Sequence, residues 1–357
     1  MSSIASSPET WSDPAHSPHC SQIYLNHPRL DFAIDPPFCR ILDDSHPHRP
    51  YQRRIGAVKS TLHWGQRKLL LSEIEFLTIL GCKALIDSTI VYAGAAPGTH
   101  ISFLSALFPS ARFILVDPAP FTVRASDKIQ IINDLFTDAL ASSLSLAHQN
   151  IYFISDIRTA DPFVDSPSAS EEKIRQDMRA QMEWHALLKS QRSMLKFRLP
   201  WDNLTSTYLA GEIRLPVWGP QTTTESRLIT DPDPSKTRLY DHEKYEGQMF
   251  HFNTTTRHSL YPHPILGEGL DHCYDCRAEI EILSNYLSEF AFPSPHIPSS
   301  VSSLSAKISR HIAFDRTLLD PTPDKEERLR RIKRRQSPNG IPPHSIKTRR
   351  IALHSPY

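Results

Sequence analysis

The chain has 357 residues, with 40 lysines and arginines against 39 aspartates and glutamates, 30 prolines, 11 glycines and 39% hydrophobic residues. These values describe one globular domain with polar extensions, and five scattered cysteines argue against a disulfide scaffold. Because the sequence has neither an apolar run of about 18 residues nor a signal-peptide pattern, we expect a cytoplasmic or nuclear protein that does not cross a membrane.

The two ends of the chain differ in composition from its middle. Residues 1–50 contain eight prolines, eight serines, five histidines and no glycine, which predicts a flexible, largely extended arm. Residues 325–357 carry a net charge of +8, while the preceding residues sum to −7. This basic tail has the composition of a segment that attracts RNA phosphates or acts as a nuclear import signal. The alternative is a solvated tail without a partner.

In the first half of the chain, helices alternate with short apolar strands. Apolar residues recur at helical spacing over 66–80, from Leu69 to Leu80, which predicts a helix. The pattern that follows predicts a strand at 89–92, a helix at 101–108, and strands at 112–116, 129–132 and 151–155. Such alternation indicates an α/β fold with a doubly wound, mostly parallel sheet.

The second half begins with a charged helix over 171–192. Strands follow at 194–199, 211–218 and 225–230, and a helix at 271–290 closes the domain. Because no helices separate these strands, we expect them to form antiparallel edges on the parallel sheet. Residues 291–306 are rich in serine and proline and look like a linker. The expected organisation is an arm at 1–50, one domain at 51–290, a linker and extension at 291–324, and the basic tail at 325–357.

Two glycines and an aspartate suggest a nucleoside cofactor. Gly94 and Gly98 end the first strand in the order Gly-Ala-Ala-Pro-Gly, where a tight turn brings the backbone close to a ligand. Asp117 ends the next strand, where a carboxylate can accept both hydroxyls of a ribose. The spacing differs from the Gly-x-Gly-x-x-Gly of NAD enzymes and favours S-adenosylmethionine. A purely structural turn is the alternative.

Three further residues stand where chemistry is common. Asp156 follows the fourth strand, at the sheet edge where open α/β folds place reactive groups, although capping of the next helix is an equal alternative. Lys196 interrupts an otherwise apolar strand, which favours a side chain that points into a cleft. Lys68 lies in the first helix and would by default be a solvated lysine.

Several motifs in order resemble the poxvirus cap-specific mRNA (nucleoside-2′-O-)methyltransferases, which also serve as the processivity subunit of the viral poly(A) polymerase. The motifs are GQRKLLLSE at 65–73, APGTH at 96–100, ISDIR at 154–158, LKFRLPWD at 195–202, TESRL at 224–228 and the Tyr245-Glu246 pair. The resemblance implies a Rossmann-like S-adenosylmethionine-dependent methyltransferase fold. It also implies a catalytic tetrad of Lys68, Asp156, Lys196 and Glu225.

The tetrad suits methyl transfer to a ribose 2′-hydroxyl. This reaction is an in-line displacement in which the hydroxyl loses its proton, so a lysine must be held as a base. We expect Lys196 to be that base, with Lys68 as the neighbouring cation that favours the neutral amine. Asp156 and Glu225 would hold both lysines in place.

The same resemblance implies contacts with S-adenosylmethionine and with the cap. The cofactor contacts would be Gln66, Leu69, Tyr92, Gly94, Gly98, His100, Asp117, Thr137 and Arg158. The methylated guanine would lie between Trp201 and Tyr51, with Asp202 and Glu246 reading its edge, because stacking on a cationic base adds a cation–π attraction. Trp201 and Asp202 need a one-residue deletion and Tyr51 a two-residue gap. Thr222 replaces a pocket tyrosine of the family, and Ala119 a cofactor-side arginine.

The resemblance implies capped mRNA as substrate and a viral polymerase or poly(A) polymerase subunit as a partner, at a cytoplasmic site of viral replication. Two alternatives stay open: a non-catalytic RNA-binding or polymerase processivity subunit, and 2′-O-methylation at RNA positions away from the cap. Cys273 and Cys276 form a single Cys-x-x-Cys without a second ligand pair, so we expect no metal.

Overall fold

The computed structural model describes residues 37–52, 65–161, 164–202, 204–220, 223–233, 235–265, 270–290 and 297–319. The arm before residue 37 and the basic tail lie outside the described residues, as does Thr222. The strands are β1 (Ile41–Leu42), β2 (Thr89–Ala93), β3 (Arg112–Val116), β4 (Ile129–Ile132), β5 (Ile151–Ser155), β6 (Arg192–Phe197), β7 (Thr205–Leu209), β8 (Gly211–Arg214), β9 (Ser226–Thr230) and β10 (Thr237–Asp241). The helices are α2 (Gly65–Leu80), α3 (Ile101–Leu107), α4 (Asp138–Ala147), α5 (Pro167–Leu187), α6 (His242–Thr254), η2 (Thr256–His258), α7 (Tyr274–Glu289) and α8 (Val301–Leu319).

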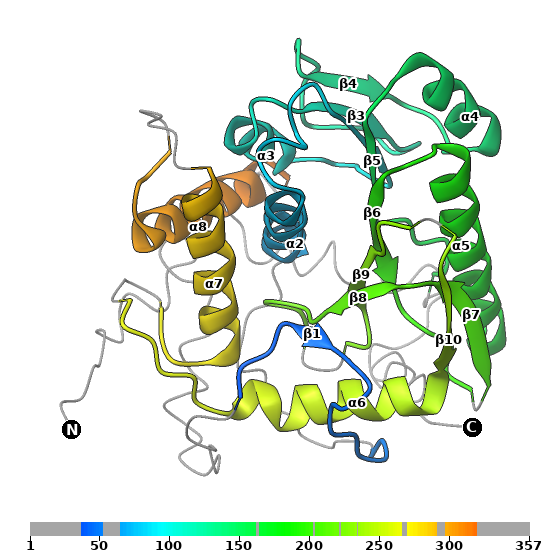
Figure 1. The fold of residues 1–357 in the computed structure, drawn as a ribbon, viewed down its shortest axis with the longest axis vertical. Coiled ribbons are helices and arrows are strands. Elements are labelled where there is room, and N and C mark those ends of the chain that lie inside the picture. The colour runs from blue at the N-terminus through cyan, green and yellow to red at the C-terminus, as the bar shows by residue number, and fades with distance from the viewer. Residues whose placement is uncertain are drawn as a thin grey trace, which may run out of the picture.

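An eight-stranded sheet in the order β1-β8-β9-β6-β5-β2-β3-β4 runs through the middle of the molecule. Helices α2, α3, α7 and α8 cover one face, and α4 and α5 cover the other (Figure 1). All five residues of both β2 and β5 are buried, as expected for parallel strands with helices on both faces. The predicted mixed α/β fold is therefore confirmed.

The edge of the sheet beyond β6 is antiparallel, as the lack of intervening helices predicted. Strand β9 pairs antiparallel with both β6 and β8, and β1 adds a short antiparallel strand at the edge. Strands β7 and β10 form a separate two-stranded sheet that the sequence analysis did not anticipate. Helix α6 begins directly after β10 and crosses below the main sheet in Figure 1.

The structure differs from the expected organisation at both ends of the domain. Strand β1 lies within the segment predicted as a flexible arm, and the neighbouring Arg40 makes a buried ion pair with Glu75 of α2. Helix α8 lies within the segment predicted as a linker and extension, and packs against α2 and α7. Leu304 and Ile308 of this helix are fully buried. Serines between these apolar residues gave the segment the composition of a linker although the apolar spacing is helical.

A buried polar network holds α8 in place. Arg67 of α2 donates to both carboxylate oxygens of Glu279 on α7 and to the hydroxyls of Ser305 and Ser309 on α8. The indole nitrogen of Trp218 donates to the same carboxylate at 2.6 Å. Three helices are thus tied together directly beside the first turn of α2. Among the described helices, none is long and apolar enough to span a membrane.

Candidate active site

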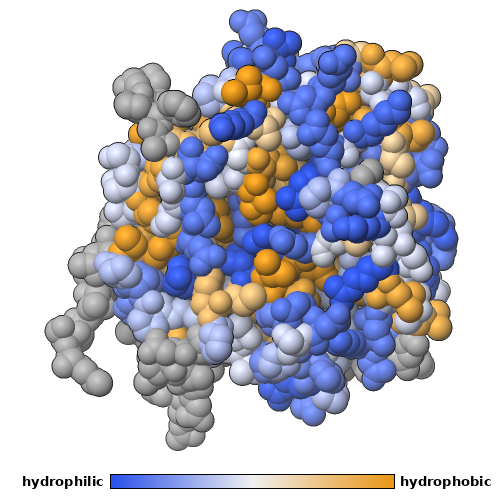
Figure 2. All heavy atoms as spheres, viewed as in Figure 1, coloured by the Kyte–Doolittle hydropathy of each residue, from blue (hydrophilic) through white to orange (hydrophobic). Residues whose placement is uncertain are grey.

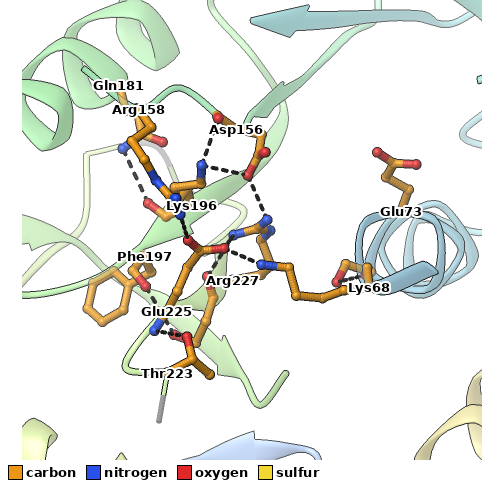
Figure 3. A network of polar contacts seen from close by, with 12 residues as sticks. Lys68, Glu73, Asp156, Arg158, Gln181, Lys196, Phe197, Thr223, Glu225 and Arg227 are labelled. Carbon is orange, nitrogen blue, oxygen red and sulfur yellow. Dashed lines mark hydrogen bonds and ion pairs between the residues drawn. The ribbon is translucent and has the colours of Figure 1, made fainter. Parts of the chain in front are cut away.

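The four predicted catalytic residues come from four elements and meet at one place. Lys68 lies on α2, Asp156 follows β5, Lys196 lies on β6 and Glu225 precedes β9 (Figure 3). They gather at the carboxyl edge of the parallel strands, where open α/β sheets bind their ligands. Figure 2 shows hydrophilic side chains within a hollow of this face, between α2 and strands β6 and β9.

Each lysine of the tetrad is held by one of the carboxylates. The Lys196 ammonium nitrogen lies 3.0 Å from Asp156 Oδ1 and donates to the Asp156 backbone oxygen at 2.8 Å. Lys68 donates a short hydrogen bond to Glu225. The four side chains are 9–18% exposed, so a ligand can reach them while most water is excluded. The prediction that these residues would form one cluster agrees with this geometry.

Arg227 completes the cluster, and the sequence analysis did not single it out. Its guanidinium donates to Asp156 Oδ1 at 2.6 Å and to Glu225 Oε1 at 3.2 Å. It lies directly opposite Lys196 in the antiparallel pairing of β6 and β9. The sequence signal that could have identified Arg227 is the one used for Lys196, a charged residue inside an otherwise apolar strand. Arg158 adds a second short contact to Glu225 from the other side.

The cluster shifts the protonation of its members. Burial lowers the pKa of Lys68, and the Arg227 charge lowers it further, although Glu225 opposes this effect. For Asp156, burial acts to raise the pKa, but Lys196 and Arg227 outweigh it and the pKa is lowered. For Glu225, burial is likewise outweighed, chiefly by the charges of Lys68 and Lys196, and the pKa lies well below its usual range. Both carboxylates are therefore ionised at neutral pH.

The loop after β2 has the shape of a ligand cradle. Gly94 and Gly98 have φ angles of +78° and +67°, a backbone conformation that residues with side chains rarely adopt. A Cβ on Gly94 would lie 2.9 Å from the backbone carbonyl carbon of Asp156, so this loop passes tightly against the backbone of that aspartate. Asp117 at the end of β3 accepts the Ala96 amide and keeps acceptor capacity for hydroxyls. These features fit the adenosine part of S-adenosylmethionine.

The other residues predicted to contact the cofactor lie outside the glycine loop. Gln66 is half-buried and hydrogen-bonds to Thr99 and His100 at the start of α3. Tyr92 is fully buried, and Thr137 caps α4 by accepting the Leu140 amide at 3.2 Å. The remaining predicted contacts are Leu69 on α2, which is half-buried, and Arg158, which pairs with Glu225.

Some of the predicted cap residues come together. The Arg198 guanidinium lies 4.2 Å from the centre of the Trp201 ring and donates to Glu171, which also accepts the Trp201 amide. Burial raises the pKa of Glu246 on α6, and the Glu171 charge raises it further. Trp201 and Glu246 therefore share one environment. Glu171, a second carboxylate in this environment, was not predicted as a cap-binding residue.

The other two predicted cap residues, Asp202 and Tyr51, contact other parts of the protein. Asp202 accepts hydrogen bonds from His242 at 2.5 Å and from Arg175, so its carboxylate already has strong partners. The Tyr51 ring packs edge-on against Phe250, with centroids 5.3 Å apart. Because Phe250 is four residues after Glu246 on α6, Tyr51 lies along the helix face that carries the predicted acidic contact.

Cys273 and Cys276 lie at the start of α7. Their sulfurs and an oxygen of Asp271 are within 4.8 Å of one another, an arrangement that could hold a metal ion. Cys273 also caps the helix by accepting the Cys276 amide, and burial raises the pKa of its thiol to about 12. Capping thus accounts for this residue, and the absence of a metal stays a prediction.

The fold and this site together define the Rossmann-like methyltransferase class, as the sequence analysis expected. The model of the poly(A) polymerase regulatory subunit family matches residues 34–292. The chain therefore belongs to that family.

The curated relatives are poxvirus enzymes. A myxoma virus (strain Lausanne) protein named cap-specific mRNA (nucleoside-2′-O-)-methyltransferase is 29% identical over 252 residues, covering 64% of this chain and 72% of that protein. A fowlpox virus (strain NVSL) protein of the same name is 31% identical over 212 residues, covering 54% and 68%. These matches confirm the expected family and the assignment of the chain to an enzyme class.

Among solved structures, bluetongue virus VP4, an RNA-capping protein, has a TM-score of 0.36 at 11% identity and covers 60% of this chain and 39% of its own. Human methyltransferase-like protein 13 with S-adenosylhomocysteine has a TM-score of 0.33 at 11% identity, covering 66% and 98%. Both likenesses are too slight to carry an argument about the site.

Proposed function

We propose that this protein transfers the methyl group of S-adenosylmethionine to the ribose 2′-hydroxyl of the first transcribed nucleotide of capped mRNA. The observation that carries the proposal is the cluster of Lys68, Asp156, Lys196 and Glu225 next to the glycine loop after β2. The names of the myxoma and fowlpox relatives support the reaction and the substrate.

S-adenosylmethionine supplies an electrophilic methyl carbon when bound. Gly94, Gly98 and Asp117 would hold its adenosine part, with the loop pressed against Asp156. In its neutral form the Lys196 amine accepts the hydroxyl proton, and its position is fixed by two oxygens of Asp156. Much of the rate enhancement comes from this fixed geometry, because reactants that are already positioned pay a smaller entropic cost to reach the transition state.

Lys68 and Glu225 form the opposite side of the same cluster. Because Lys68 is only 12% exposed and is bound to Glu225, an entering ribose would meet an amine that is already held in place. The lowered pKa of Lys68 lets its amine exchange a proton more readily than an exposed lysine would. Arg227 links the two halves by binding both carboxylates, so the tetrad acts as one rigid unit.

The cap would bind beside Trp201 and Glu246. The Arg198 guanidinium already lies on the Trp201 ring, which indicates that the ring attracts a flat cation. A methylated guanine is also a flat cation. The acidic pair of Glu171 and Glu246 adds negative charge that favours it over an uncharged base.

The test is methyl transfer from labelled S-adenosylmethionine to a capped RNA and to the same RNA with a 2′-deoxy first nucleotide. The proposal predicts that the ribose substrate accepts label and the deoxy substrate does not. Equal labelling of both RNAs would show that another atom is methylated.

The family description favours a second role, as the regulatory subunit of a poly(A) polymerase. We propose that this role uses a surface separate from the tetrad. The Lys196→Ala variant should then still extend the tails made by the polymerase catalytic subunit. A variant that loses both activities together would contradict separate surfaces.

A further inference from the structure

Arg198 is a charged residue directly after β6 that no step of the proposed reaction uses. Side chains alternate across a strand, and Phe197, the residue before it, is fully buried. Arg198 therefore continues on the side of the strand that carries Lys196, about 7 Å further along. Its guanidinium lies 4.2 Å from the centre of the Trp201 ring. This side chain thus lies between the candidate base and the ring proposed to bind the cap.

The charges around Arg198 come from the same two parts of the site. Burial lowers the pKa of Arg198, and the charge of Glu171 opposes this shift. The charges of Arg158 and of Glu225 in the tetrad also act on it. Arg158 is bound to Glu225 and has a side chain that is 58% exposed (Figure 3). Two guanidinium groups that repel each other therefore lie beside the tetrad, and an anionic ligand would relieve that repulsion.

The guanidinium of Arg198 has hydrogen-bond donors to spare. One of its terminal nitrogens donates to Glu171 Oε1 at 2.8 Å. Its Nε is buried, and no hydrogen-bond partner for this atom occurs within the described part of the chain. An unsatisfied buried donor costs free energy, which a ligand acceptor would recover. Because the side chain as a whole is 27% exposed, such a ligand can reach the guanidinium.

We propose that Arg198 binds the triphosphate bridge of capped RNA. This assignment rests on the proposed function. The cap base is joined to the first transcribed nucleotide by a triphosphate. With the base at Trp201 and the ribose at Lys196, that bridge has to pass Arg198. A planar guanidinium presents a fork of N–H donors that matches phosphate oxygens. Arg198 would thereby fix how far the first ribose lies from the cap, and so bring its hydroxyl to the tetrad.

The test measures the affinity of the protein for 7-methylguanosine and for its triphosphate by calorimetric titration. The wild type should bind the triphosphate more tightly. Arg198→Met should weaken binding of the triphosphate about tenfold or more, because hydrogen bonds to a charged group are lost. Its affinity for the nucleoside should change little. Equal losses for both ligands would mean that Arg198 only holds Trp201 in place, and no loss for either would also overturn the proposal.

An uncapped RNA with a 5′-hydroxyl end distinguishes the triphosphate bridge from the RNA backbone. This RNA carries backbone phosphates but no triphosphate, so Arg198→Met should bind it as the wild type does. A loss of affinity for this RNA as large as the loss for the triphosphate would assign Arg198 to the backbone and overturn the proposal.

Arg238→Met is the matched control. Arg238 on β10 also lies over an aromatic ring, 5.1 Å from the centre of Tyr240, and donates to a carboxylate of Asp44 at 2.7 Å. It belongs to the separate two-stranded sheet, so this variant should keep both affinities. If Arg198→Met does not fold, Arg198→Gln removes the charge and keeps a donor for Glu171. Full preference for the triphosphate in Arg198→Gln would overturn the proposal.

The wild-type protein separates this inference from the proposed function. If it binds neither the nucleoside nor the triphosphate, the proposed recognition of the cap is itself contradicted, and the inference with it. If it binds both equally well, recognition of the methylated base stands and only the role of Arg198 is wrong.

Discussion

At the scale of single residues, the site is an alternation of opposite charges. Asp156 lies between Lys196 and Arg227, and Glu225 lies between Lys68 and Arg158. Arg227 also contacts Glu225, so each carboxylate holds at least two cations that would otherwise repel each other. Removing one member changes the position of its neighbours as well as its own chemistry.

Lys196→Ala tests the assigned base. The variant should lose methyl transfer by about 10²- to 10⁴-fold, the usual contribution of a positioned acid or base. Its affinity for S-adenosylhomocysteine should stay unchanged, since Lys196 binds Asp156 and not the glycine loop. Lys83→Ala, an exposed lysine after α2, is the control and should keep full activity. Full activity of Lys196→Ala would refute the assignment.

Trp201→Ala tests the cap-binding position. Loss of stacking should weaken binding of capped RNA by about 1–3 kcal/mol, the usual range for a base on an aromatic ring. Binding of the same RNA without a cap should change little, and fluorescence anisotropy measures both. Similar losses for the two RNAs would place the cap elsewhere.

Residue types alone revealed only part of this site. The four tetrad residues were matched by their motifs, but Arg227 and Glu171 act through neighbours that are distant in sequence. Glu73 looked like the polar side of a helix, yet it is fully buried because His100 gives it a partner. Spacing along one segment cannot show such a partner from another segment.

At the scale of elements, α2 connects the site to the rest of the fold. Its first turns carry Gln66 and Lys68, and Arg67 between them points into the network with Glu279 and α8. The position of Lys68 therefore depends on helices α7 and α8. These two helices follow the strands of the candidate site by many residues in the chain.

Arg67→Met tests this dependence. It leaves Glu279 buried without its cation, so the free energy of unfolding should fall by about 3–5 kcal/mol in urea denaturation. The exposed Arg179→Met is the control and should change stability little, because its ion pair is on the surface. A loss no greater than that of the control would show that the network is not needed.

The parallel strands were predictable, because buried strands read as short apolar runs. Helices α3 and α5 were predicted as well, but helix α4 between β4 and β5 was not. Helix α8 and strand β1 were not, since they lie in segments whose composition resembles a linker or an arm. Strands β7 and β10 were also missed. They are partly exposed, so apolar and polar residues alternate only weakly along them, and their pairing depends on tertiary contacts.

At the scale of the whole molecule, two ion-paired carboxylates make stability depend on pH. Asp156 and Glu225 have lowered pKa values in the folded protein, whereas the pKa of a carboxyl group in the unfolded chain is about 4. Their contribution to stability is therefore complete above about pH 4 and is lost as the pH falls through the lowered folded values.

Glu225→Gln should flatten this acid dependence. The variant is less stable at neutral pH, because Lys68 loses its charged partner, and loses less further stability between neutral and acid pH than the wild type. Denaturation at a series of pH values measures both effects. Glu243→Gln, an exposed residue of α6, is the control and should follow the wild-type curve. An unchanged acid slope in Glu225→Gln would contradict the lowered pKa.

The central claim is that the tetrad methylates the first transcribed ribose of capped RNA. The most direct measurement is nuclease mapping of the labelled nucleotide after transfer to RNAs with a methylated cap, an unmethylated cap or no cap. We expect label only on the first transcribed ribose, and most with the methylated cap. Label at internal positions, or equal label on uncapped RNA, would contradict it.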